Sequence, residues 1–173
     1  MTLPRAVTTH SEPDSLYAIA MVCLGNICRS PVAEVVLSAK LAAAGLDDVT
    51  VDSAGTGGWH VGEPIDPRAA AMLDEHGYDP RPHRARQFSA AWFDTHDLVL
   101  AMDRSNLDEL ERISRSADDL GKISMFRSFD PDATGSLDVP DPWYGGRADF
   151  ERVLGIVERT TNALVDELRT LNS

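Results

Sequence analysis

The sequence predicts an α/β domain with a central parallel sheet that is covered by helices on both faces. Short apolar runs alternate with longer segments of helical character along the chain, and this alternation is typical of such sheets. The 173 residues fit one domain of ordinary size. Hydrophobic residues make up 43% and charged residues 25%, which is the globular range and excludes collagen-like, coiled-coil and wholly disordered chains.

The four expected strands are short apolar runs. The first reads YAIAMV and the third reads DLVLAM, and both are apolar almost throughout, as in strands that are buried on both faces. The second and the fourth are briefer. In chain order, the strands are expected over residues 17–22, 49–52, 97–102 and 123–126.

Proline and glycine positions mark the ends of the first two helices. Pro31 stands at the start of the first helix and Gly45 follows its end, while Pro67 and Gly77 bracket the second. The third helix is amphipathic, and the last keeps apolar residues close to helical spacing. The helices are expected over residues 31–44, 66–76, 103–114 and 149–171.

Two polar segments lie outside these elements. Residues 127–147 are rich in Asp, Pro and Gly, and a loop of roughly twenty residues inside a compact domain is usually functional or disordered. Residues 1–15 lack the apolar stretch of a secretory signal. We expect residues 1–15 to be a disordered lead-in and residues 16–173 to form a single domain.

Charge and cysteine content limit the partners and the compartment. The chain has 16 Lys and Arg against 28 Asp and Glu, a formal net charge of −12. An acidic domain binds nucleic acid and anionic membranes poorly, and no stretch approaches the ~20 apolar residues of a transmembrane helix. Two cysteines are no disulfide framework, so we expect a cytoplasmic protein. A small phosphorylated substrate remains compatible, because local amides and one Arg outweigh the global charge at short range.

The loop after the first strand, CLGNICRSP from Cys23 to Pro31, carries the chemistry. Ligands of such folds bind at the carboxyl ends of the strands. Gly25 and Asn26 tolerate positive φ, so the loop can curl and point its N–H groups inward as an anion nest. The helix N-terminus and Arg29 add positive charge. The same field is expected to lower the pKa of Cys23 and make it a thiolate nucleophile.

Other interpretations of this loop are weaker. Cys23 could be a small core residue beside an ordinary strand–helix loop. Cys23 and Cys28 would supply half of a zinc site, but no second ligand pair accompanies them and the five histidines are scattered. No G-x-G-x-x-G follows the first strand, so a dinucleotide site is not indicated. We therefore expect neither a metal nor a cofactor.

The string C-x5-R-S resembles the signature loop of cysteine-based phosphatases. The longer string VCLGNICRSPVAE resembles the low molecular weight protein tyrosine phosphatase family, in its bacterial, actinobacterial-type form. Further similar segments follow in one order: VDSAGT at 51–56, Trp59, HRARQ at 83–87, MDRSN at 102–106 and DPWY at 141–144. The resemblance covers all but residues 1–15. It implies a three-layer sandwich around a four-stranded parallel sheet, of the flavodoxin- or Rossmann-like phosphotyrosine phosphatase I type.

What the resemblance implies is hydrolysis of phosphotyrosine in proteins through a phosphocysteine intermediate. Cys23 attacks phosphorus, and Arg29 with the loop amides holds the phosphate oxygens. Asp141 protonates the leaving phenol, whose pKa is near ~10, and then acts as the base. The expected substrate-binding residues are Leu24, Gly25, Asn26, Ile27, Cys28, Ser30, Trp59, Trp143 and Tyr144. The family usually has Tyr at position 143, so the wider Trp ring is expected to change substrate preference.

Supporting and regulatory roles follow from the same resemblance. Ser53 and His83 match a hydrogen-bond network that holds the loop in shape. Ser30 is expected to donate to the Cys23 sulfur, and it also stands where a helix N-cap would be. Cys28 is expected to form a reversible disulfide with Cys23 under peroxide. The implied partners are phosphotyrosine proteins, including a bacterial tyrosine kinase, with phosphate and other oxyanions as inhibitors. Release from the cell without a signal stays open.

Three alternatives to tyrosine phosphatase activity remain. Arsenate reductases use a similar loop and fold, but they pass oxidation to cysteines outside the loop, and none exists in this sequence. Protein arginine phosphatases share the fold, with Thr where Ile27 stands here. A catalytically dead phosphate-binding module is the third, and it is disfavoured by the intact set of Cys23, Arg29 and Asp141.

Overall fold

The computed structural model describes residues 3–6 and 15–172. The strands found there are β1 (Tyr17–Cys23), β2 (Val49–Gly55), β3 (Leu98–Ala101) and β4 (Ile123–Met125). The longer helices are α1 (Arg29–Ala43), α2 (Pro67–Glu75), α4 (Arg104–Ile113) and α6 (Arg147–Arg169). The short ones are α3 (Trp92–Thr95), α5 (Ala117–Gly121) and the 3-10 turns η1 (Phe126–Phe129) and η2 (Thr170–Asn172).

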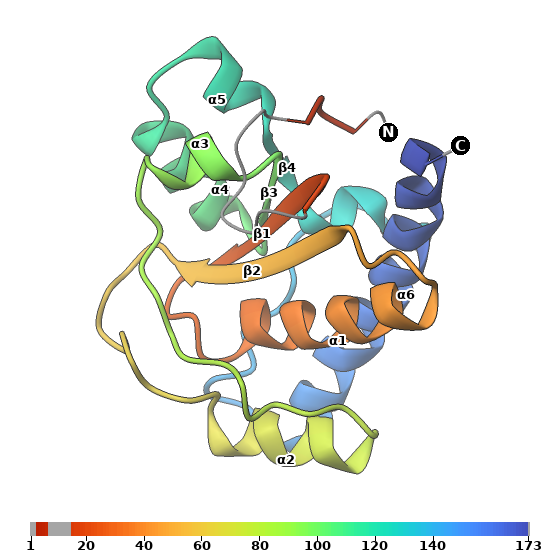
Figure 1. The fold of residues 1–173 in the computed structure, drawn as a ribbon. Helices are drawn as coiled ribbons and strands as arrows, with labels where there is room; N and C mark the ends of the chain where they lie inside the picture. The colour runs from red at the N-terminus through yellow and green to blue at the C-terminus, as the bar shows by residue number, and fades with distance from the viewer. Residues whose placement is uncertain (1–2, 7–14, 173) are drawn as a thin grey trace.

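The sheet is parallel throughout, with the strand order β2-β1-β3-β4 (Figure 1). Val22 of β1 pairs with Ala54 of β2 on one side and with Ala101 of β3 on the other. From β1 the chain continues to β2 on one side of the sheet, whereas β3 and β4 lie on the other side. The connections that follow β1 and β3 therefore run in opposite directions from two adjacent strand ends. A crevice forms at such a point, at the carboxyl edge of the sheet. The predicted fold class is confirmed.

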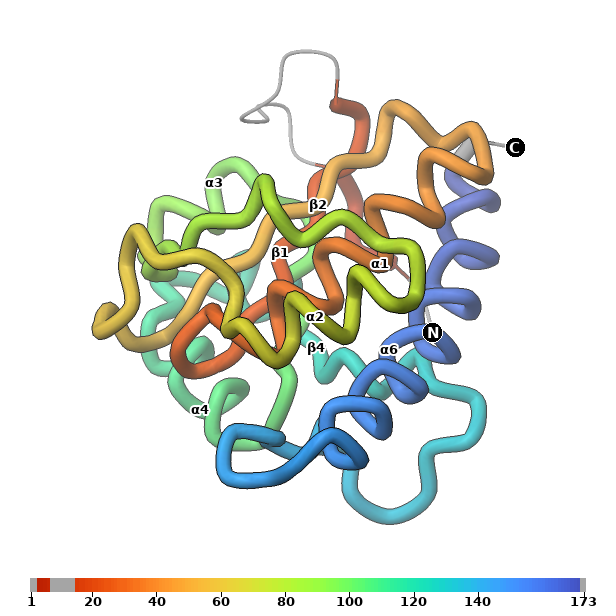
Figure 2. Tube along the Cα trace, turned by 90° about the horizontal axis from the view of Figure 1, so that it is seen from below, coloured from red at the N-terminus to blue at the C-terminus, as the bar shows by residue number. Residues whose placement is uncertain are grey.

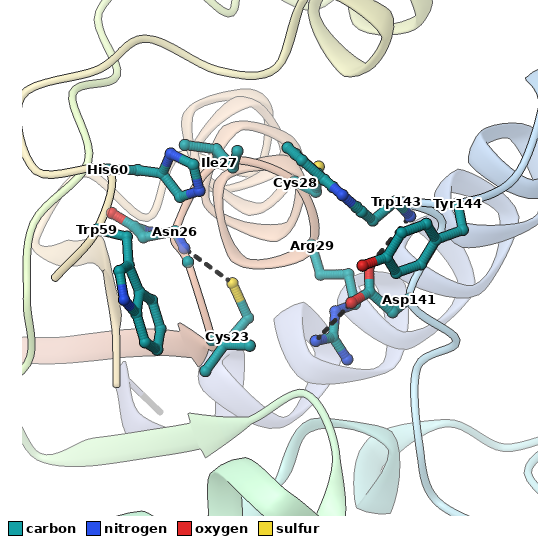
Figure 3. A pocket seen from close by; sticks show the side chains of 12 residues that line it. Cys23, Asn26, Ile27, Cys28, Arg29, Trp59, His60, Asp141, Trp143 and Tyr144 are labelled. Atoms are coloured by element: carbon teal, nitrogen blue, oxygen red, sulfur yellow. Dashed lines mark hydrogen bonds and ion pairs between the residues drawn. The ribbon is translucent and has the colours of Figure 1, made fainter. Parts of the chain in front are cut away.

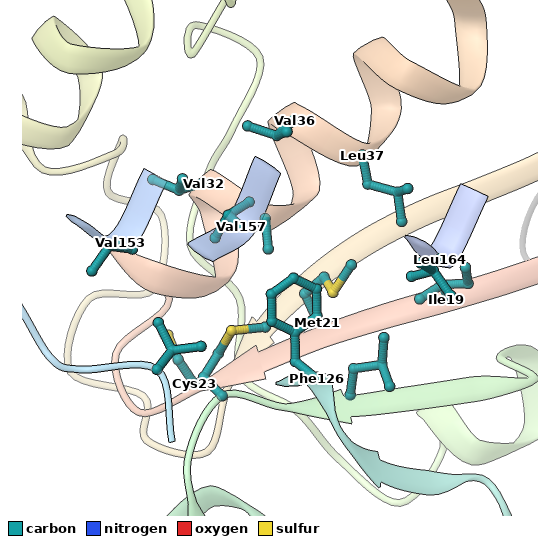
Figure 4. Packing of buried hydrophobic residues seen from close by; sticks show 14 of the residues in the cluster. Ile19, Met21, Cys23, Val32, Val36, Leu37, Phe126, Val153, Val157 and Leu164 are labelled. Carbon is teal, nitrogen blue, oxygen red and sulfur yellow. The ribbon is translucent and has the colours of Figure 1, made fainter. Parts of the chain in front are cut away.

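Side chains of β1 alternate between two apolar clusters, which makes three layers. Ile19 and Met21 belong to the larger cluster with α1 and α6, where Met21 lies beside Phe126 (Figure 4). Ala20 and Val22 face the other way, into a smaller cluster that contains residues of α3 and α4. The buried strand thus fixes both helical layers around the crevice.

The ends of the elements differ from the sequence prediction in informative ways. The first helix begins at Arg29, two residues before Pro31, because a proline without an N–H group is tolerated anywhere in a helix's first turn. Gly45 and Gly77 adopt positive φ of 70° and 83° after their helices, as the C-terminal glycine signal requires. The helices α3 and α5 are too short to show a periodic pattern, and the sequence prediction lacked them.

The segment between β4 and α6 begins with η1 and then has no helix or strand from residue 130 to residue 146. Seen from below, it forms an open arc beside α6 (Figure 2). Residues 1–2 and 7–14 of the expected lead-in lie outside the described residues. Of the remainder, Leu3 packs against the core and the Pro4 carbonyl accepts a hydrogen bond from the Tyr17 hydroxyl at 3.0 Å. None of the helices in the described ranges is long and apolar enough to cross a membrane.

Candidate active site

A pocket of about 220 Å³ opens at the carboxyl end of β1 (Figure 3). Its base runs from the last residue of β1 to the first turn of α1, residues 23–30, which we call the cysteine loop. One side is closed by residues 139–146, which we call the aspartate loop. The lining residues are Cys23, Leu24, Gly25, Asn26, Ile27, Cys28, Arg29, Trp59, His60, Asp141, Trp143 and Tyr144.

Asn26 determines how the cysteine loop curls. Its φ of 57° is the only positive value at a non-glycine residue in the described ranges, and Asn is among the few residues that adopt this conformation readily. Gly25 is not among the glycines of positive φ. Its missing side chain instead leaves room for His60, because a Cβ at Gly25 would lie 3.1 Å from the His60 ring.

Asn26 is also the centre of a buried polar network. Its side-chain amide donates to Ser30 Oγ and to Ser53 Oγ, each at 2.9 Å, and its Oδ1 accepts from the backbone N–H of Arg86 at 2.9 Å. His83 Nε2 donates to the Asn26 carbonyl at 2.8 Å. Both expected support residues, Ser53 and His83, thus contact Asn26 directly, although neither lines the pocket.

Glu34, on the second turn of α1, completes this network. Its carboxylate accepts a hydrogen bond from Ser53 Oγ and lies 3.1 Å from His83 Nδ1. No side-chain polar atom that is fully buried in the described residues lacks a partner. Fully satisfied buried networks rigidify their surroundings, so the curl of the cysteine loop is fixed before any ligand arrives.

The Cys23 sulfur lies at the bottom of the pocket and faces two donors. The backbone N–H of Asn26 donates to Cys23 Sγ at 3.3 Å, and Ser30 Oγ lies 2.9 Å from the sulfur. Because Ser30 Oγ accepts from the Asn26 amide, its own proton is free to point at the sulfur. Ser30 is the second residue of α1 and not its N-cap, contrary to the expectation; the N-cap position is Cys28.

The N-terminus of α1 is open toward the pocket. It has no side-chain cap hydrogen bond and no acidic residue in its first turn. The first N–H groups of a helix have no partner inside the helix, and their partial positive charge favours an anion. This end of α1 can therefore bind a phosphate-sized dianion directly above Cys23.

Arg29 is buried at the edge of the same pocket. Its Nη1 donates to Asp103 Oδ2 at 2.7 Å and to the Val139 carbonyl at 3.1 Å. Burial on its own lowers the pKa of Arg29, but the opposing effects of Cys23, Asp103 and Asp141 outweigh it and raise the pKa above its ordinary value. Arg29 is therefore a fixed cation in the pocket.

Asp141 is the exposed carboxylate of the site. Half of its side chain, 51%, is accessible, and its Oδ2 lies 3.7 Å from Arg29 Nη2. Its Oδ1 accepts from the backbone N–H of Trp143 at 3.1 Å. Two residues earlier, the Val139 N–H donates to the carbonyl of Met102, just after β3, at 2.7 Å. The aspartate loop is thus fixed to the sheet immediately before Asp141.

Cys28 lines the same pocket as Cys23. Burial, followed by the negative charges of Asp66, Cys23 and Asp141, raises the pKa of the Cys28 thiol to about 12. Both cysteines are free thiols. Cys28 is therefore a neutral side chain near neutral pH.

The rim of the pocket is aromatic. Trp59 and His60 stand on one side, and Trp143 and Tyr144 on the other (Figure 3). The His60 and Trp143 rings are 6.0 Å apart between centroids. Tyr144 is 98% exposed, and Trp59 and Leu24 are also exposed. The His60 and Trp143 rings are in contact, so a flat aromatic group bound above Cys23 would lie against this rim.

The comparisons with known proteins agree with this geometry. Residues 18–172 match the model of the low molecular weight phosphotyrosine protein phosphatases. A low molecular weight protein-tyrosine-phosphatase of Streptomyces coelicolor is 50% identical over 155 residues, which is 88% of this chain and 94% of that protein. The chain belongs to the low molecular weight phosphotyrosine protein phosphatase family.

Solved structures of phosphatases have the same fold. The protein tyrosine phosphatase of Entamoeba histolytica, with Hepes in its active site, superposes with a TM-score of 0.84 at 32% identity, covering 91% of this chain and 99% of that one. Wzb of Vibrio vulnificus, in complex with benzylphosphonate, gives a TM-score of 0.76 at 28% identity, covering 87% and 98%. As a family member, the chain is a protein-tyrosine phosphatase, and the predicted family, function and enzyme class are confirmed. The arsenate reductase and arginine phosphatase alternatives are not favoured.

Several residues of this phosphatase site were not given a role in the sequence analysis. Asp103 follows β3 and binds Arg29, but its proximity to the cysteine loop depends on β3 lying next to β1. Glu34 is four residues after Ser30, so helical spacing was an available signal. His60 follows Trp59 directly, and only the pocket shows that it lines the wall. The described residues contain no cluster of three or more His, Cys, Asp or Glu that could hold a metal ion.

Proposed function

We propose that phosphotyrosine hydrolysis takes place in this pocket, with Cys23 as the nucleophile, Arg29 as the phosphate-binding cation and Asp141 as the general acid and base. The observation that carries the proposal is the convergence of three groups on one opening. They are the Cys23 sulfur with its two donors, the uncapped N-terminus of α1, and the Arg29–Asp141 pair at 3.7 Å.

In the first step, the Cys23 thiolate attacks phosphorus, an S–P bond forms, and the P–O bond to the tyrosine oxygen breaks. The cysteine-loop amides and Arg29 hold the three non-bridging oxygens, so charge in the transition state meets donors that are already in place. Asp141 gives its proton to the departing phenolate, because a phenol of pKa near ~10 leaves slowly as an anion. Asp141 is therefore ionised when the intermediate forms.

In the second step, water attacks the phosphocysteine and Asp141 accepts the proton of that water. The S–P bond breaks, and the electron pair returns to sulfur. The Ser30 hydroxyl, whose oxygen already accepts a hydrogen bond from the Asn26 amide, is free to donate to the sulfur and stabilises the thiolate as it leaves. Phosphate then dissociates, and Asp141 is protonated again for the next cycle.

The remaining assigned residues bind or support the substrate. Leu24, Ile27 and the rim aromatics accept the ring of phosphotyrosine between them, and Ser53 with His83 keeps the loop curled through Asn26. Benzylphosphonate, which is bound by the Vibrio vulnificus relative, joins a phenyl ring to a phosphonate group and so resembles the phosphorylated ring of phosphotyrosine. We take phosphotyrosine proteins, among them a bacterial tyrosine kinase, as substrates, and phosphate and similar oxyanions as competitive inhibitors. We also propose that residues 16–173 form a single phosphatase domain and that the protein acts in the cytoplasm.

We also propose that Cys28 protects Cys23 during oxidation. Peroxide oxidises the Cys23 thiolate to a sulfenic acid with release of water or hydroxide. The Cys28 thiol then displaces that oxygen as water and forms a disulfide. Intact-mass analysis after peroxide should show loss of two hydrogens in the wild type. Accumulation of sulfinic Cys23 with no such loss would contradict the role.

The mechanism is tested by trapping the intermediate. A phosphotyrosyl peptide is mixed with enzyme, the reaction is quenched in acid within milliseconds, and the intact protein is weighed. We expect an added phosphoryl group that peptide mapping assigns to Cys23. Cys23→Ser should give no adduct, whereas the matched Cys28→Ser should still give one. A phosphoryl group on any other residue would contradict the proposal.

A further inference from the structure

The tripeptide Asp-Pro-Arg occurs twice in the chain, at 66–68 and at 79–81. The two copies have the same internal bonding. The Arg68 N–H and guanidinium donate to Asp66 at 2.9, 3.1 and 3.1 Å. Those of Arg81 donate to Asp79 at 3.1, 2.8 and 3.0 Å. Each arginine is therefore held by its own aspartate, Arg68 in the first turn of α2 and Arg81 in a loop.

The two arginines differ in what lies beyond that aspartate. The Arg81 side chain is 85% exposed, and within the described ranges its guanidinium bonds only to Asp79. The Arg68 guanidinium also donates to the Trp143 carbonyl at 2.9 Å. It lies 5.5 Å from the centre of the Trp143 ring and 4.8 Å from that of Phe150 on α6. One copy of the motif therefore contacts the aspartate loop, and the other is a solvated turn.

The Arg68 contact is made at the residue that binds the catalytic carboxylate. The Trp143 N–H donates to Asp141 Oδ1 at 3.1 Å, while its carbonyl accepts from Arg68. On its other side, the turn contacts the cysteine loop, since the Asp66 N–H donates to the Ile27 carbonyl at 2.9 Å. The N-terminal end of α2, from its N-cap Asp66 to Arg68, thus bridges the loop that holds the phosphate and the loop that holds the acid.

We infer that Arg68 is a positioning residue that holds the Asp141 carboxyl within reach of the leaving oxygen. The inference rests on the proposed role of Asp141. Proton transfer needs a heavy-atom separation of about 2.6–3.2 Å, and misplacement of a catalytic group by about 1 Å can cost up to 10²-fold in rate. Asp141 itself is half exposed, and the hydrogen bond that its carboxylate accepts from the Trp143 backbone is the restraint that Arg68 holds in place.

The test separates positioning of the acid from general packing. We would measure kcat/KM, which reports P–O cleavage, for phenyl phosphate and for p-nitrophenyl phosphate, whose leaving phenol is far more acidic. Arg68→Ala should lower kcat/KM about 10-fold or more for phenyl phosphate and less than about 3-fold for p-nitrophenyl phosphate. The matched Arg81→Ala should change neither value. Arg68→Met, which keeps a long apolar stem beside Phe150, should show the same selective loss as Arg68→Ala.

Asp141→Ala, measured alongside, separates the role of Arg68 from the role of Asp141. Suppose that Asp141→Ala loses activity selectively on phenyl phosphate. If Arg68→Ala then loses activity equally on both substrates, or loses none, the role of Arg68 is overturned and that of Asp141 stands. An equal loss on both substrates in Asp141→Ala overturns the acid assignment and the Arg68 role with it. The expected result is selective loss in both, and no further selective loss when Arg68→Ala is added to Asp141→Ala, because residues that act as a unit are not additive.

Discussion

The two sides of the pocket are built in different ways. The cysteine loop is held by buried side chains: Asn26, Ser30 and Ser53 are inaccessible to solvent and bond to one another. The aspartate loop is held largely through its backbone, at Val139 and Trp143, and it presents exposed side chains such as Tyr144. The fold therefore preorganises the phosphate site, whereas substitutions of Asp141 and of the rim side chains should have little effect on the core.

Substitution of the nucleophile or of the buried arginine in the cysteine loop should have the largest effect. Cys23→Ser should abolish turnover and leave oxyanion binding largely intact, because the amides and Arg29 remain. Arg29→Ala should lose about 10³–10⁵ in kcat/KM and should also lose binding. Turnover is measured on a phosphotyrosyl peptide, and binding as the rise of Tm with added phosphate. Turnover by Cys23→Ser would contradict the assignment of Cys23 as the nucleophile.

The acid on the exposed side should have a smaller and substrate-dependent effect. Asp141→Ala should slow the release of poor leaving groups by about 10²–10⁴, with much less effect on good ones. The fold should stay intact, because half of the Asp141 side chain is in solvent. The measurement is a series of kcat/KM values against the pKa of the leaving phenol. A slope equal to that of the wild type would count against Asp141 as the acid.

A matched pair of truncations sharpens the comparison between the two sides. Asn26→Ala removes three side-chain hydrogen bonds and places Ala at positive φ. It should cost about 10–100-fold in kcat/KM and about 1–3 kcal/mol or more in the free energy of unfolding. Tyr144→Ala should lose about 10-fold or less through weaker ring contact, with no change in stability. Urea unfolding and kinetics on both variants check this, and similar stability losses in the two would break the comparison.

The two thiols of the cysteine loop should differ in their reactivity toward alkylating reagents. The pKa of Cys28 is raised to about 12, so at pH 7–8 Cys28 is a neutral thiol that reacts slowly with alkylating reagents from solution. We expect iodoacetate to label Cys23 at pH 7 and to label Cys28 only after unfolding, as read by peptide mass. Prior incubation with phosphate should protect Cys23. Equal labelling of both in the folded protein would contradict the assignment.

The smallest effect on activity, with a clear effect on stability, is expected at Asp130, which follows η1 on the way to the aspartate loop. Buried Asp130 accepts from Arg159 at 2.6 Å and from Arg127 at 3.0 Å. Hydrogen bonding to Arg159, more than any other contact, lowers its pKa to about 2. Because the folded pKa is depressed, this stabilisation is present above about pH 4 and is lost as the pH falls toward 2.

Asp130→Asn should therefore lower the free energy of unfolding by about 1–3 kcal/mol at pH 7 and make it less dependent on pH between 4 and 2. Urea unfolding at several pH values measures both quantities, and Asp132→Asn, which removes a mostly exposed neighbour, is the control. An unchanged pH dependence would contradict the role of Asp130.

The same contrast explains what the sequence could predict. The cysteine loop was predictable because its residues are contiguous and their spacing carries the chemistry, and the strand pattern was predictable because buried strands are apolar throughout. The roles of Asp103 and Arg68 were not predictable. They depend on which strand lies next to β1 and on the contact between the start of α2 and the aspartate loop. The two Asp-Pro-Arg copies make the point directly: their letters are identical, and only the fold distinguishes the one that contacts Trp143 from the one that meets solvent.

The most direct test of the account measures phosphate release from matched peptides that carry phosphotyrosine, phosphoserine or phosphoarginine. The reactions contain EDTA, and Cys23→Ser is the control. We predict release from phosphotyrosine alone, unaffected by the chelator and absent in Cys23→Ser. Preference for phosphoarginine, or release that persists in Cys23→Ser, would contradict the claim that this pocket hydrolyses phosphotyrosine through Cys23.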